Sequence, residues 1–243
     1  MRVLIISDIH ANLAALEAVL AAAGPAEAVW CLGDLVGYGP DPNECVERVR
    51  DLPNLKCVMG NHDKAVLAEI DIKAFNGDAR TAIEWTQSVA TPETLAYLRA
   101  LPEGDEFEEF SLFHGSPRQP VWEYILDRWT AQQNFPCFKT RYCLVGHTHT
   151  PVIFRELTGD SVCREERPDY VRARQLNSDR LILNPGSVGQ PRDNNPAAAY
   201  AFLDTVTRQW KHRRVSYDVA KTQARMRAAH LPDRLAARLA LGW

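Results

Sequence analysis

Apolar residues gather in short runs along the first part of the chain, and residues with a helical pattern separate these runs. The continuous run at residues 3–6 predicts a strand that is buried on both faces, and the runs at residues 28–32 and 55–59 predict two further strands. Apolar residues recur at helical spacing over residues 13–23, and a second helix is predicted over about residues 44–51. This alternation predicts right-handed crossovers between parallel strands and therefore an α/β fold.

The rest of the chain continues with a helical middle and further strands. Residues 64–100 are predicted to be helical, with a helix start at Thr91-Pro92. Strands are predicted at residues 106–113, 142–145, 152–157, 181–183, 198–204 and 209–217. The polar residues 158–179 predict a surface hairpin or loop. A C-terminal helical segment, about residues 218–243 with a break near Pro232, completes a single predicted domain over residues 1–243.

Composition and charge narrow the classes of function. The chain has 243 residues, 46% of them hydrophobic, and a net charge of -3. This balance is typical of a globular protein and implies no general attraction to nucleic acid. The six cysteines form no C-x-x-C pair, which predicts a reducing, cytoplasmic setting, and no apolar run is long enough to span a membrane. The oligomeric state stays open, with a homo-oligomer among the options.

Five short motifs contain five of the seven histidines and the most conspicuous Asp and Asn residues. In chain order they are S-D-I-H at residues 7–10, G-D at 33–34, G-N-H-D at 60–63, H-G at 114–115 and G-H-T-H at 146–149. The first three and the last each follow an apolar run of strand character. Ligands of open α/β sheets bind outside the carboxyl ends of the strands, so these motifs predict one shared site.

The residue types in the motifs predict a metal site. Asp8 and His10 alternate through Ile9, so both can face one cavity at a strand end while Ile9 points into the core. The seven candidate ligands are Asp8, His10, Asp34, Asn61, His114, His147 and His149. Mixed oxygen and imidazole ligands suit Mn, Fe, Zn, Co or Ni. Seven ligands are enough for two ions that share a carboxylate and clamp a phosphate.

Each motif alone also has a structural interpretation. An Asp beside a Gly, or an Asn after a Gly, is usually a turn residue, and a single His after a strand is usually a core or surface residue. Chance turns do not explain five such motifs at strand ends. The metal site is therefore the favoured interpretation.

The set of motifs, in this order, resembles the calcineurin-like metallophosphoesterases over about residues 3–193, in particular their small prokaryotic phosphodiesterase-like branch. The resemblance implies a four-layer α/β/β/α sandwich of two mixed sheets flanked by helices. It also implies two divalent transition-metal ions, with Mn expected and Fe, Zn, Co or Ni as alternatives. One ion would be held by Asp8, His10 and His149, the other by Asn61, His114 and His147, and Asp34 would bridge them.

The resemblance further implies roles in catalysis. A metal-bridging hydroxide would attack phosphorus, and His62, together with Asp34, would be catalytic, with His62 protonating the leaving oxygen. The structural alternative for His62 is support of Asn61. Asn12, Asn61 and Arg192 are expected to contact the substrate, while Asn12 and Arg192 could instead stabilise turns.

Residues beside the second motif separate subfamilies. Protein Ser/Thr phosphatases and symmetric dinucleoside tetraphosphatases look like G-D-x-V-D-R-G there, and this chain has Gly37 and Tyr38 in place of the Asp-Arg pair. The favoured function is therefore hydrolysis of a small phosphodiester or phosphomonoester, including a nucleotide. A dinucleoside polyphosphate hydrolase or a protein Ser/Thr phosphatase is the alternative. A non-catalytic scaffold is disfavoured because His62 and all seven ligands are present.

Other chemistries lack their motifs. The chain contains no G-x-x-x-x-G-K-[ST], no G-x-G-x-x-G and no G-x-S-x-G. Three aromatic residues, Trp122, Tyr124 and Trp129, could form a wall on which a base stacks, but a core or dimer surface is the favoured interpretation.

Overall fold

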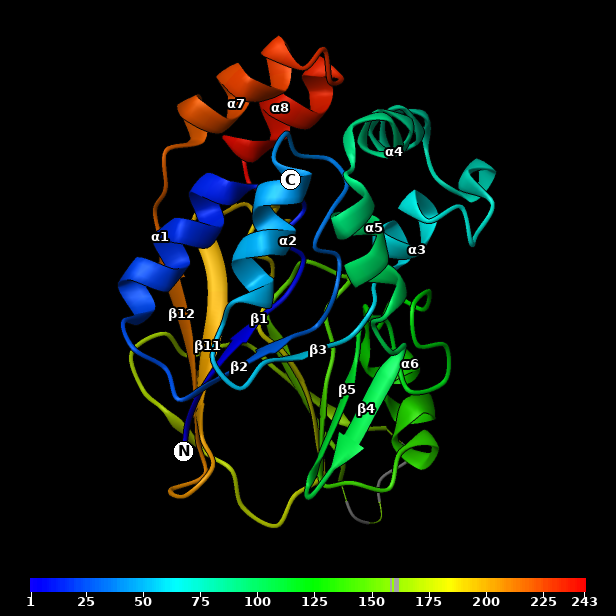
Figure 1. Cartoon of the computed structure of the whole chain (residues 1–243). Helices are drawn as coiled ribbons and strands as arrows, with labels where there is room; N and C mark the ends of the chain where they lie inside the picture. The colour runs from blue at the N-terminus through cyan, green and yellow to red at the C-terminus, as the bar shows by residue number, and fades with distance from the viewer. Residues whose placement is uncertain (158, 160–161) are drawn as a thin grey trace.

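The strands form two sheets that face each other in the computed structural model, which describes residues 1–157, 159 and 162–243 (Figure 1). Within these residues each sheet has six strands. In spatial order the first sheet contains β3 (Lys56–Cys57), β2 (Ala28–Cys31), β1 (Arg2–Ile6), β11 (Ala198–Asp204), β12 (Gln209–Val215) and β9 (Arg174–Gln175). The second contains β4 (Gly104–Phe107), β5 (Phe110–Phe113), β6 (Tyr142–Leu144), β10 (Leu181–Asn184), β7 (Val152–Arg155) and β8 (Arg164–Glu166).

Helices cover the outer faces of both sheets. The first half of the chain contributes α1 (Leu13–Ala23), α2 (Pro42–Arg50), α3 (Asn61–Val66), the short 3₁₀ helix η1 (Ile72–Ala74), α4 (Gly77–Val89) and α5 (Pro92–Arg99). The second half contributes α6 (Arg128–Asn134), the 3₁₀ helix η2 (Phe135–Cys137), α7 (Val219–Ala228) and α8 (Asp233–Leu239). The α1 and α2 helices pack on the first sheet and α6 on the second, so the predicted four-layer α/β/β/α sandwich of mixed sheets is confirmed.

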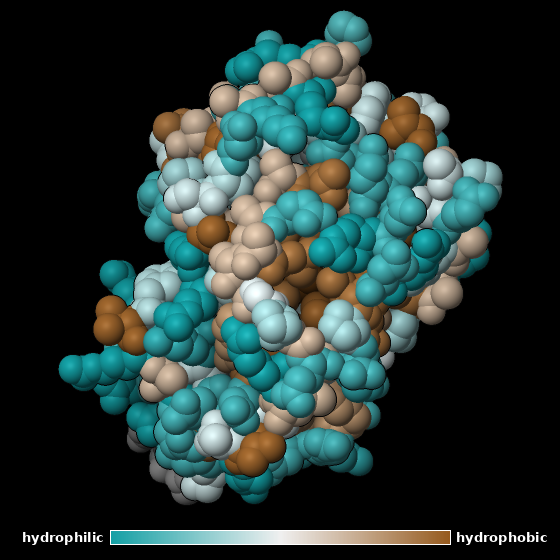
Figure 2. All heavy atoms as spheres, turned by 60° about the vertical axis from the view of Figure 1, so that its left-hand side comes forward, coloured by the Kyte–Doolittle hydropathy of each residue, from teal (hydrophilic) through white to brown (hydrophobic). Residues whose placement is uncertain are grey.

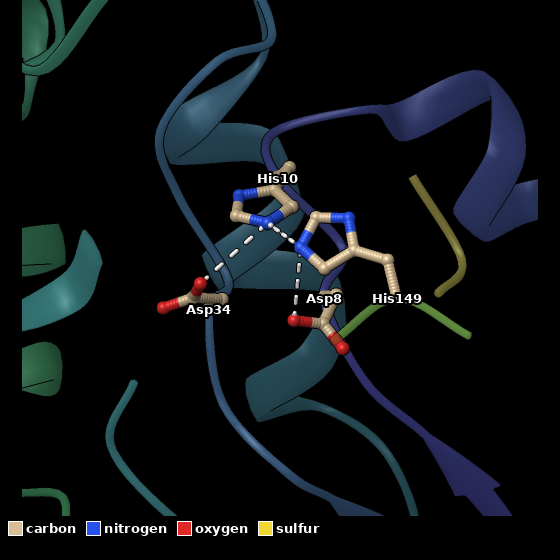
Figure 3. Close-up of side chains that lie close together, drawn as sticks. All are labelled: Asp8, His10, Asp34 and His149. Atoms are coloured by element: carbon tan, nitrogen blue, oxygen red, sulfur yellow. Dashed lines mark hydrogen bonds and ion pairs between the residues drawn. The ribbon is translucent and has the colours of Figure 1, made fainter. Parts of the chain in front are cut away.

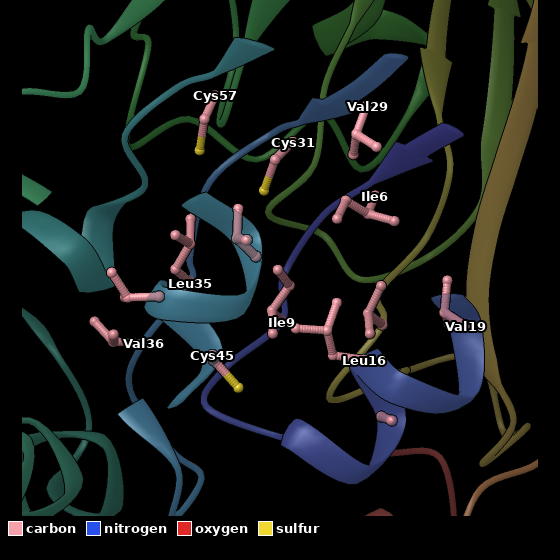
Figure 4. Packing of buried hydrophobic residues seen from close by; sticks show 14 of the residues in the cluster. Ile6, Ile9, Leu16, Val19, Val29, Cys31, Leu35, Val36, Cys45 and Cys57 are labelled. Carbon is pink, nitrogen blue, oxygen red and sulfur yellow. The ribbon is translucent and has the colours of Figure 1, made fainter. Parts of the chain in front are cut away.

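Alternate residues of each inner strand enter different cores. In β1, Leu4 and Ile6 belong to the cluster beneath α1 and α2, in which Figure 4 labels Ile6. Val3 and Ile5 belong instead to the cluster between the two sheets. Successive strand side chains point to opposite faces, so a strand covered on both sides must be apolar at every position. This is why the continuous apolar run at residues 3–6 predicted a buried strand correctly.

Three neighbouring parallel strands in each sheet determine where the site lies. In the first sheet β1, β2 and β3 run parallel, and in the second sheet β5, β6 and β10 do so. The remaining pairings are antiparallel. The segments that leave the carboxyl ends of these six strands supply the residues of the five motifs and the loop that contains Arg192.

The structure corrects several predicted elements. Residues 106–113, predicted as one strand, form the β4–β5 hairpin, because Glu108 adopts a positive φ of 48° and reverses the chain. The predicted surface hairpin or loop over residues 158–179 supplies β8 to one sheet and β9 to the other, and residues 158, 160 and 161 lie outside the described residues. Polar composition hid these short edge strands.

The two C-terminal helices, α7 and α8, pack against the first-motif region and α4. Met226 and Leu239 share a buried cluster with Tyr38 and Ala82, and Thr222 Oγ1 donates to Asn12 Oδ1 at 3.0 Å. The chain breaks between them near Pro232, as predicted. This segment therefore closes over the end of the molecule that carries the motifs (Figure 1).

The distribution of polar side chains on the surface and the free cysteines are typical of a globular protein. On the face shown in Figure 2, apolar side chains gather in a central hollow and polar side chains surround it. No disulfide joins the cysteines, all of which belong to the described part of the chain. Among the described helices, none has both the length and the apolar character needed to cross a bilayer.

A buried histidine joins β12 to the loop after β10. His212 Nδ1 accepts a hydrogen bond from the Trp210 indole at 3.2 Å, and its Nε2–H donates to the Asn184 carbonyl at 2.8 Å. These two bonds require the neutral ring. Burial accordingly lowers the pKa of His212 to about 4.

We predict that this histidine makes the free energy of unfolding depend on pH. Between its unfolded pKa of about 6.5 and its folded value of about 4, only the unfolded chain takes up a proton here. Stability is therefore lost as the pH falls through this window. The stability of the wild type relative to His212→Gln, from urea unfolding, should fall by about 2 kcal/mol between pH 7 and pH 5. The same pH dependence in both proteins would contradict this.

Candidate metal centre

Left-handed backbone turns, rather than strand ends, aim most of the predicted ligands. Asp8, His10, Asp34, His147 and His149 have φ values of 54°, 49°, 55°, 64° and 59°. Non-glycine residues rarely adopt this conformation, and it is concentrated at functional sites when it occurs. The strand alternation proposed for the first motif was wrong in its cause, because β1 ends at Ile6. Asp8 and His10 nevertheless lie in the same group of side chains, and Ile9 is buried in the core as predicted.

One group of side chains contains Asp8, His10, His149 and Asp34 (Figure 3). His10 Nε2 lies 3.0 Å from His149 Nε2 and 3.5 Å from Asp34 Oδ2. His149 Nε2 lies 3.3 Å from Asp8 Oδ1. All four residues are buried. Lone pairs of nitrogen and oxygen therefore converge on one small volume, which suits a cation.

A second group contains Asn61, His114, His147 and again Asp34. His114 Nε2 lies 3.0 Å from His147 Nδ1, 3.1 Å from Asn61 Oδ1 and 3.3 Å from Asp34 Oδ2. The two groups share only Asp34. The structure thus brings together all seven side chains that the motifs singled out as ligands, in the two sets that the resemblance implied.

The Asp34 carboxylate fits a position between two cations. Its Oδ1 accepts the backbone N–H of His62 at 2.9 Å. Its Oδ2 is buried and has no hydrogen-bond partner among the described residues, although it faces both groups. An ionised oxygen without a partner is costly in a protein interior. A pair of metal ions would satisfy it, so the donor set fits two divalent ions.

Backbone carbonyls hold each histidine ring in one tautomer. His10, His114 and His149 donate Nδ1–H to the carbonyls of Val36, Leu32 and Gln190 at 3.2, 2.8 and 2.5 Å. These bonds leave Nε2 free for a metal. The ring of His147 is reversed: its Nε2–H donates to the carbonyl of Trp122 at 3.2 Å, and Nδ1 is free. In each case the ring nitrogen without a backbone partner is the one that faces the cluster.

Charge and burial shift the pKa values of these groups. Burial lowers the pKa values of His10, His147 and His149 well below the usual range, which keeps their lone pairs available. Burial also opposes a charge on His114, but the Asp34 carboxylate outweighs it and raises the pKa of His114 to about 9. Metal ions compete with protons for such ligands, so a metal ion bound by His114 and Asp34 would displace the proton of His114.

Asp63 is a residue of the third motif to which sequence reasoning gave no role. Its buried carboxylate accepts the backbone N–H groups of Asp34 and Gly60, both at 2.9 Å, and of Leu35 and Val36 at 2.9 and 3.2 Å. It thereby holds the turn that carries Asp34 against the start of α3. The G-N-H-D motif contained this residue, but only the fold shows which backbone groups it binds.

The loop after β10 fastens two of the motif turns together. Asn184 Nδ2 donates to the Gly146 carbonyl at 2.8 Å, and Ser187 Oγ donates to the Asp8 carbonyl at 2.9 Å. The backbone N–H of His147 donates to the Asp8 carboxylate at 3.1 Å. The first and last motifs, which follow strands of different sheets, are therefore held in one position.

His62 lies beside both groups and belongs to neither. Its ring packs against Tyr38 at 4.3 Å and Phe75 at 5.0 Å between centroids. A Cβ at Gly37, whose φ is 86°, would lie 2.4 Å from His62 Nδ1, so the Asp found there in other subfamilies does not fit this backbone. Burial lowers the pKa of His62 to about 4, so the ring is uncharged near pH 7 in this state.

Arg192 lies against Tyr38, beside the site. Its guanidinium donates to Gln190 Oε1 at 2.9 Å and to Tyr38 Oη at 3.4 Å. Its Nε has no partner among the described residues. Tyr38 stands where the resemblance implies an arginine in protein Ser/Thr phosphatases, and here Arg192, from the loop after β10, lies against it.

The Asn12 side chain makes hydrogen bonds within the protein at both ends of its amide. Its Oδ1 caps α1 by accepting the Ala15 N–H at 3.2 Å and also accepts the Thr222 hydroxyl. Its Nδ2 donates to the Gly189 carbonyl at 2.9 Å and to Tyr217 Oη at 3.2 Å. These bonds favour the structural interpretation, and a contact between Asn12 and a phosphate stays a prediction.

A pocket of about 380 Å³ opens beside His62. Its lining residues are Tyr38, Asn61, His62, Ala74, Phe75, Asn76, Trp122 and Tyr124. The interpretation of Trp122 and Tyr124 as core residues was wrong, because they are 38% and 43% exposed, and their interpretation as a dimer surface stays a prediction. Both line this pocket, whereas Trp129 is 59% exposed and is not part of the lining.

Comparison with known proteins identifies the family. Residues 1–208 match the model of the calcineurin-like phosphoesterase superfamily domain. A crystal structure of a metallophosphoesterase from Sphaerobacter thermophilus is 47% identical, with a TM-score of 0.92, and the match covers 100% of this chain and 99% of that one. An uncharacterized protein of Methanocaldococcus jannaschii is 37% identical over 98% of this chain and 97% of its own length. Phosphodiesterase YfcE of Escherichia coli is 27% identical over 84% and 88%.

The matches cover the strands and turns that bring the motifs together, and α7 and α8 lie beyond the family model. They agree with the resemblance that the five motifs carry. The chain belongs to the calcineurin-like phosphoesterase superfamily, and it is a hydrolase of phosphoric ester bonds.

Proposed function

We propose that the chain is a dimetal-dependent phosphoesterase of small phosphodiesters or phosphomonoesters. The observation that carries the proposal is the buried, unpartnered Oδ2 of Asp34, which faces both ligand groups. Asp8, His10 and His149 would hold one ion, and Asn61, His114 and His147 the other, with Asp34 between them. Manganese is the proposed metal. When bound, the two ions supply positive charge for the phosphate and activate the attacking water.

The residues beside the ions would bind and orient the ester. The Arg192 guanidinium lies against Tyr38, which lines the pocket beside His62, and its Nε has no partner among the described residues. A guanidinium binds phosphate oxygens through paired hydrogen bonds, so Arg192 would bind the phosphate. Asn61 would contribute a neutral oxygen, which leaves the site more cationic and favours an anionic substrate. Asp63 would position the bridging carboxylate through its bonds to the Asp34 turn.

His62 would give a proton to the leaving oxygen. The proton donor is the imidazolium form of the ring, and the negative charge of an ester bound beside His62 would favour this form. The ring lines the pocket together with Asn61, so it is close to the proposed metals without being a ligand. Its close packing on Gly37 distinguishes this arrangement from the Asp-supported histidine of protein phosphatases and symmetric dinucleoside tetraphosphatases.

A metal-dependence assay tests the proposed function directly. Purified protein with Mn²⁺ is expected to hydrolyse bis-p-nitrophenyl phosphate or p-nitrophenyl phosphate, and EDTA should abolish the reaction until Mn²⁺ is restored. The two substrates separate diesterase from monoesterase activity. Hydrolysis that survives exhaustive chelation would contradict a metal mechanism.

The bridging carboxylate gives a second prediction. Asp34→Asn keeps an oxygen for the His62 N–H but removes the charge shared by the two ligand groups. We expect it to lose turnover and to bind fewer metal ions by elemental analysis, with an unchanged circular dichroism spectrum. The matched control is Asp51→Asn at the exposed end of α2. Wild-type metal content and turnover in Asp34→Asn would refute the bridging role.

Removal of His62 should show its role through the leaving group. We expect His62→Ala to slow hydrolysis of alkyl phosphates by roughly 10²–10⁴-fold. Esters of p-nitrophenol should be slowed much less, because p-nitrophenolate leaves without a proton. His230→Ala, which changes an exposed histidine, is the control. An equal loss for both kinds of ester would assign His62 to binding or support of Asn61 instead.

A further inference from the structure

Four aromatic side chains surround the space next to the proposed reaction centre. Tyr38, Phe75, Trp122 and Tyr124 line the pocket of about 380 Å³, and His62 lines it as well. The Phe75 and Trp122 rings lie 5.2 Å apart between centroids, with 54° between their planes. Phe75 also contacts the His62 ring. The aromatic surface therefore continues to the residue proposed to protonate the leaving oxygen.

Two of these side chains are exposed on the side that faces the pocket. Trp122 is 38% and Tyr124 is 43% exposed, although other large rings such as Trp30 and Trp210 are fully buried. Exposed apolar surface gathered in a concave site is typical of ligand recognition. These rings do not complete the core of the described chain, so their surface is available to a bound group.

Trp122 and Tyr124, which together with Phe75 form the aromatic wall of the pocket, contact the proposed metal ligand His147. The Tyr124 ring stacks on the His147 ring with centroids 3.7 Å apart and 22° between the planes. The Trp122 carbonyl accepts the His147 Nε2–H, and the Trp122 N–H donates to the Gln119 carbonyl at 3.2 Å. These contacts hold the wall in a fixed position before a ligand arrives, which reduces the entropy lost on binding.

The lining chemistry selects an uncharged, flat group. All eight lining residues belong to the described part of the chain, and none of them is Lys, Arg, Asp or Glu. A charged group would therefore find no partner of opposite charge among the lining residues, and the neighbouring Arg192, which lies against Tyr38, is the cation proposed to bind the reacting phosphate. A planar ring would gain stacking surface on several sides, and every nucleobase has a face that stacks on aromatic side chains.

We propose that Phe75, Trp122 and Tyr124 form a subsite for a planar aromatic group of the substrate, so that the enzyme prefers nucleoside phosphate esters to aliphatic ones. This inference rests on the proposed function for the position of the phosphate. A nucleobase or a simple aryl group would supply the same stacking chemistry. Trp122 is the specificity-determining residue to test first, because its side chain is exposed in the pocket.

Ligands that differ only in the ring give the sharpest experiment. Manganese-loaded protein is titrated calorimetrically with adenosine 5′-phosphate, ribose 5-phosphate and phenyl phosphate, and kcat/KM is compared for any of them that is hydrolysed. We expect the adenine ring to strengthen binding or kcat/KM by roughly 5- to 150-fold over ribose 5-phosphate, the range that corresponds to stacking of one base.

Variants of Trp122 test whether the aromatic wall causes the preference for adenosine 5′-phosphate over ribose 5-phosphate. Trp122→Ala should bring the ratio of adenosine 5′-phosphate to ribose 5-phosphate close to one, and Trp122→Phe should restore part of it. Ribose 5-phosphate itself should bind both variants as it binds the wild type. Trp129→Ala, which changes an exposed tryptophan outside the pocket, should keep the wild-type ratio.

The outcomes separate this inference from the proposed function. A wild-type ratio near one, or an unchanged ratio in Trp122→Ala, would overturn the subsite even if phosphate esters are hydrolysed. A ring preference that depends on Trp122 would support the subsite even if no ester tested is hydrolysed. Phenyl phosphate distinguishes the two sources: weaker binding than adenosine 5′-phosphate indicates a nucleobase subsite, and equal binding indicates one for any aryl group.

Discussion

The buried carboxylate of Asp34 is the constraint on which the site depends. One oxygen is used by the His62 N–H, and the other faces two sets of nitrogen and oxygen lone pairs without a hydrogen-bond partner among the described residues. A carboxylate in a protein interior is costly unless positive charge lies close to it. Protonated His114, whose Nε2 lies 3.3 Å from Oδ2, supplies such charge, and metal ions would replace that proton. Cations resolve this cost, and the same cations bind phosphate. The buried Asp34 carboxylate thus favours the binding of the same metal ions that would carry out the proposed hydrolysis.

The surrounding structure holds that charge in position. Parallel strands of both sheets end at this edge, and left-handed turns redirect the chain so that side chains point inward. Such turns cost free energy, which fixed contacts must offset. Asp63 supplies contacts on one side through four backbone N–H groups, and Asn184 and Ser187 supply them on the other. Because each ring donates to a backbone carbonyl, its free nitrogen faces the cluster before any metal binds.

Sequence patterns predicted the layers and the seven candidate ligands because those signals are local. Continuous apolar runs reveal strands covered on both faces, and the motifs follow the strands directly. Contacts between residues that are far apart in the sequence could not be predicted from these local patterns. The bonds of Asn12 reach Gly189 and Tyr217, far along the chain, and only the fold shows that they occupy its amide. Trp122 and Tyr124 lie in a segment without helical or strand periodicity, so their approach to His147 gave no sequence signal.

The central claim is that two metal ions share Asp34. A crystal structure of the manganese-loaded protein, with anomalous diffraction recorded at the manganese edge, tests it most directly. The account predicts two anomalous peaks roughly 3.5–4 Å apart. One should lie among Asp8, His10 and His149 and the other among Asn61, His114 and His147, with Asp34 Oδ2 between them. A single peak, or peaks that leave Asp34 without a metal, would contradict the account.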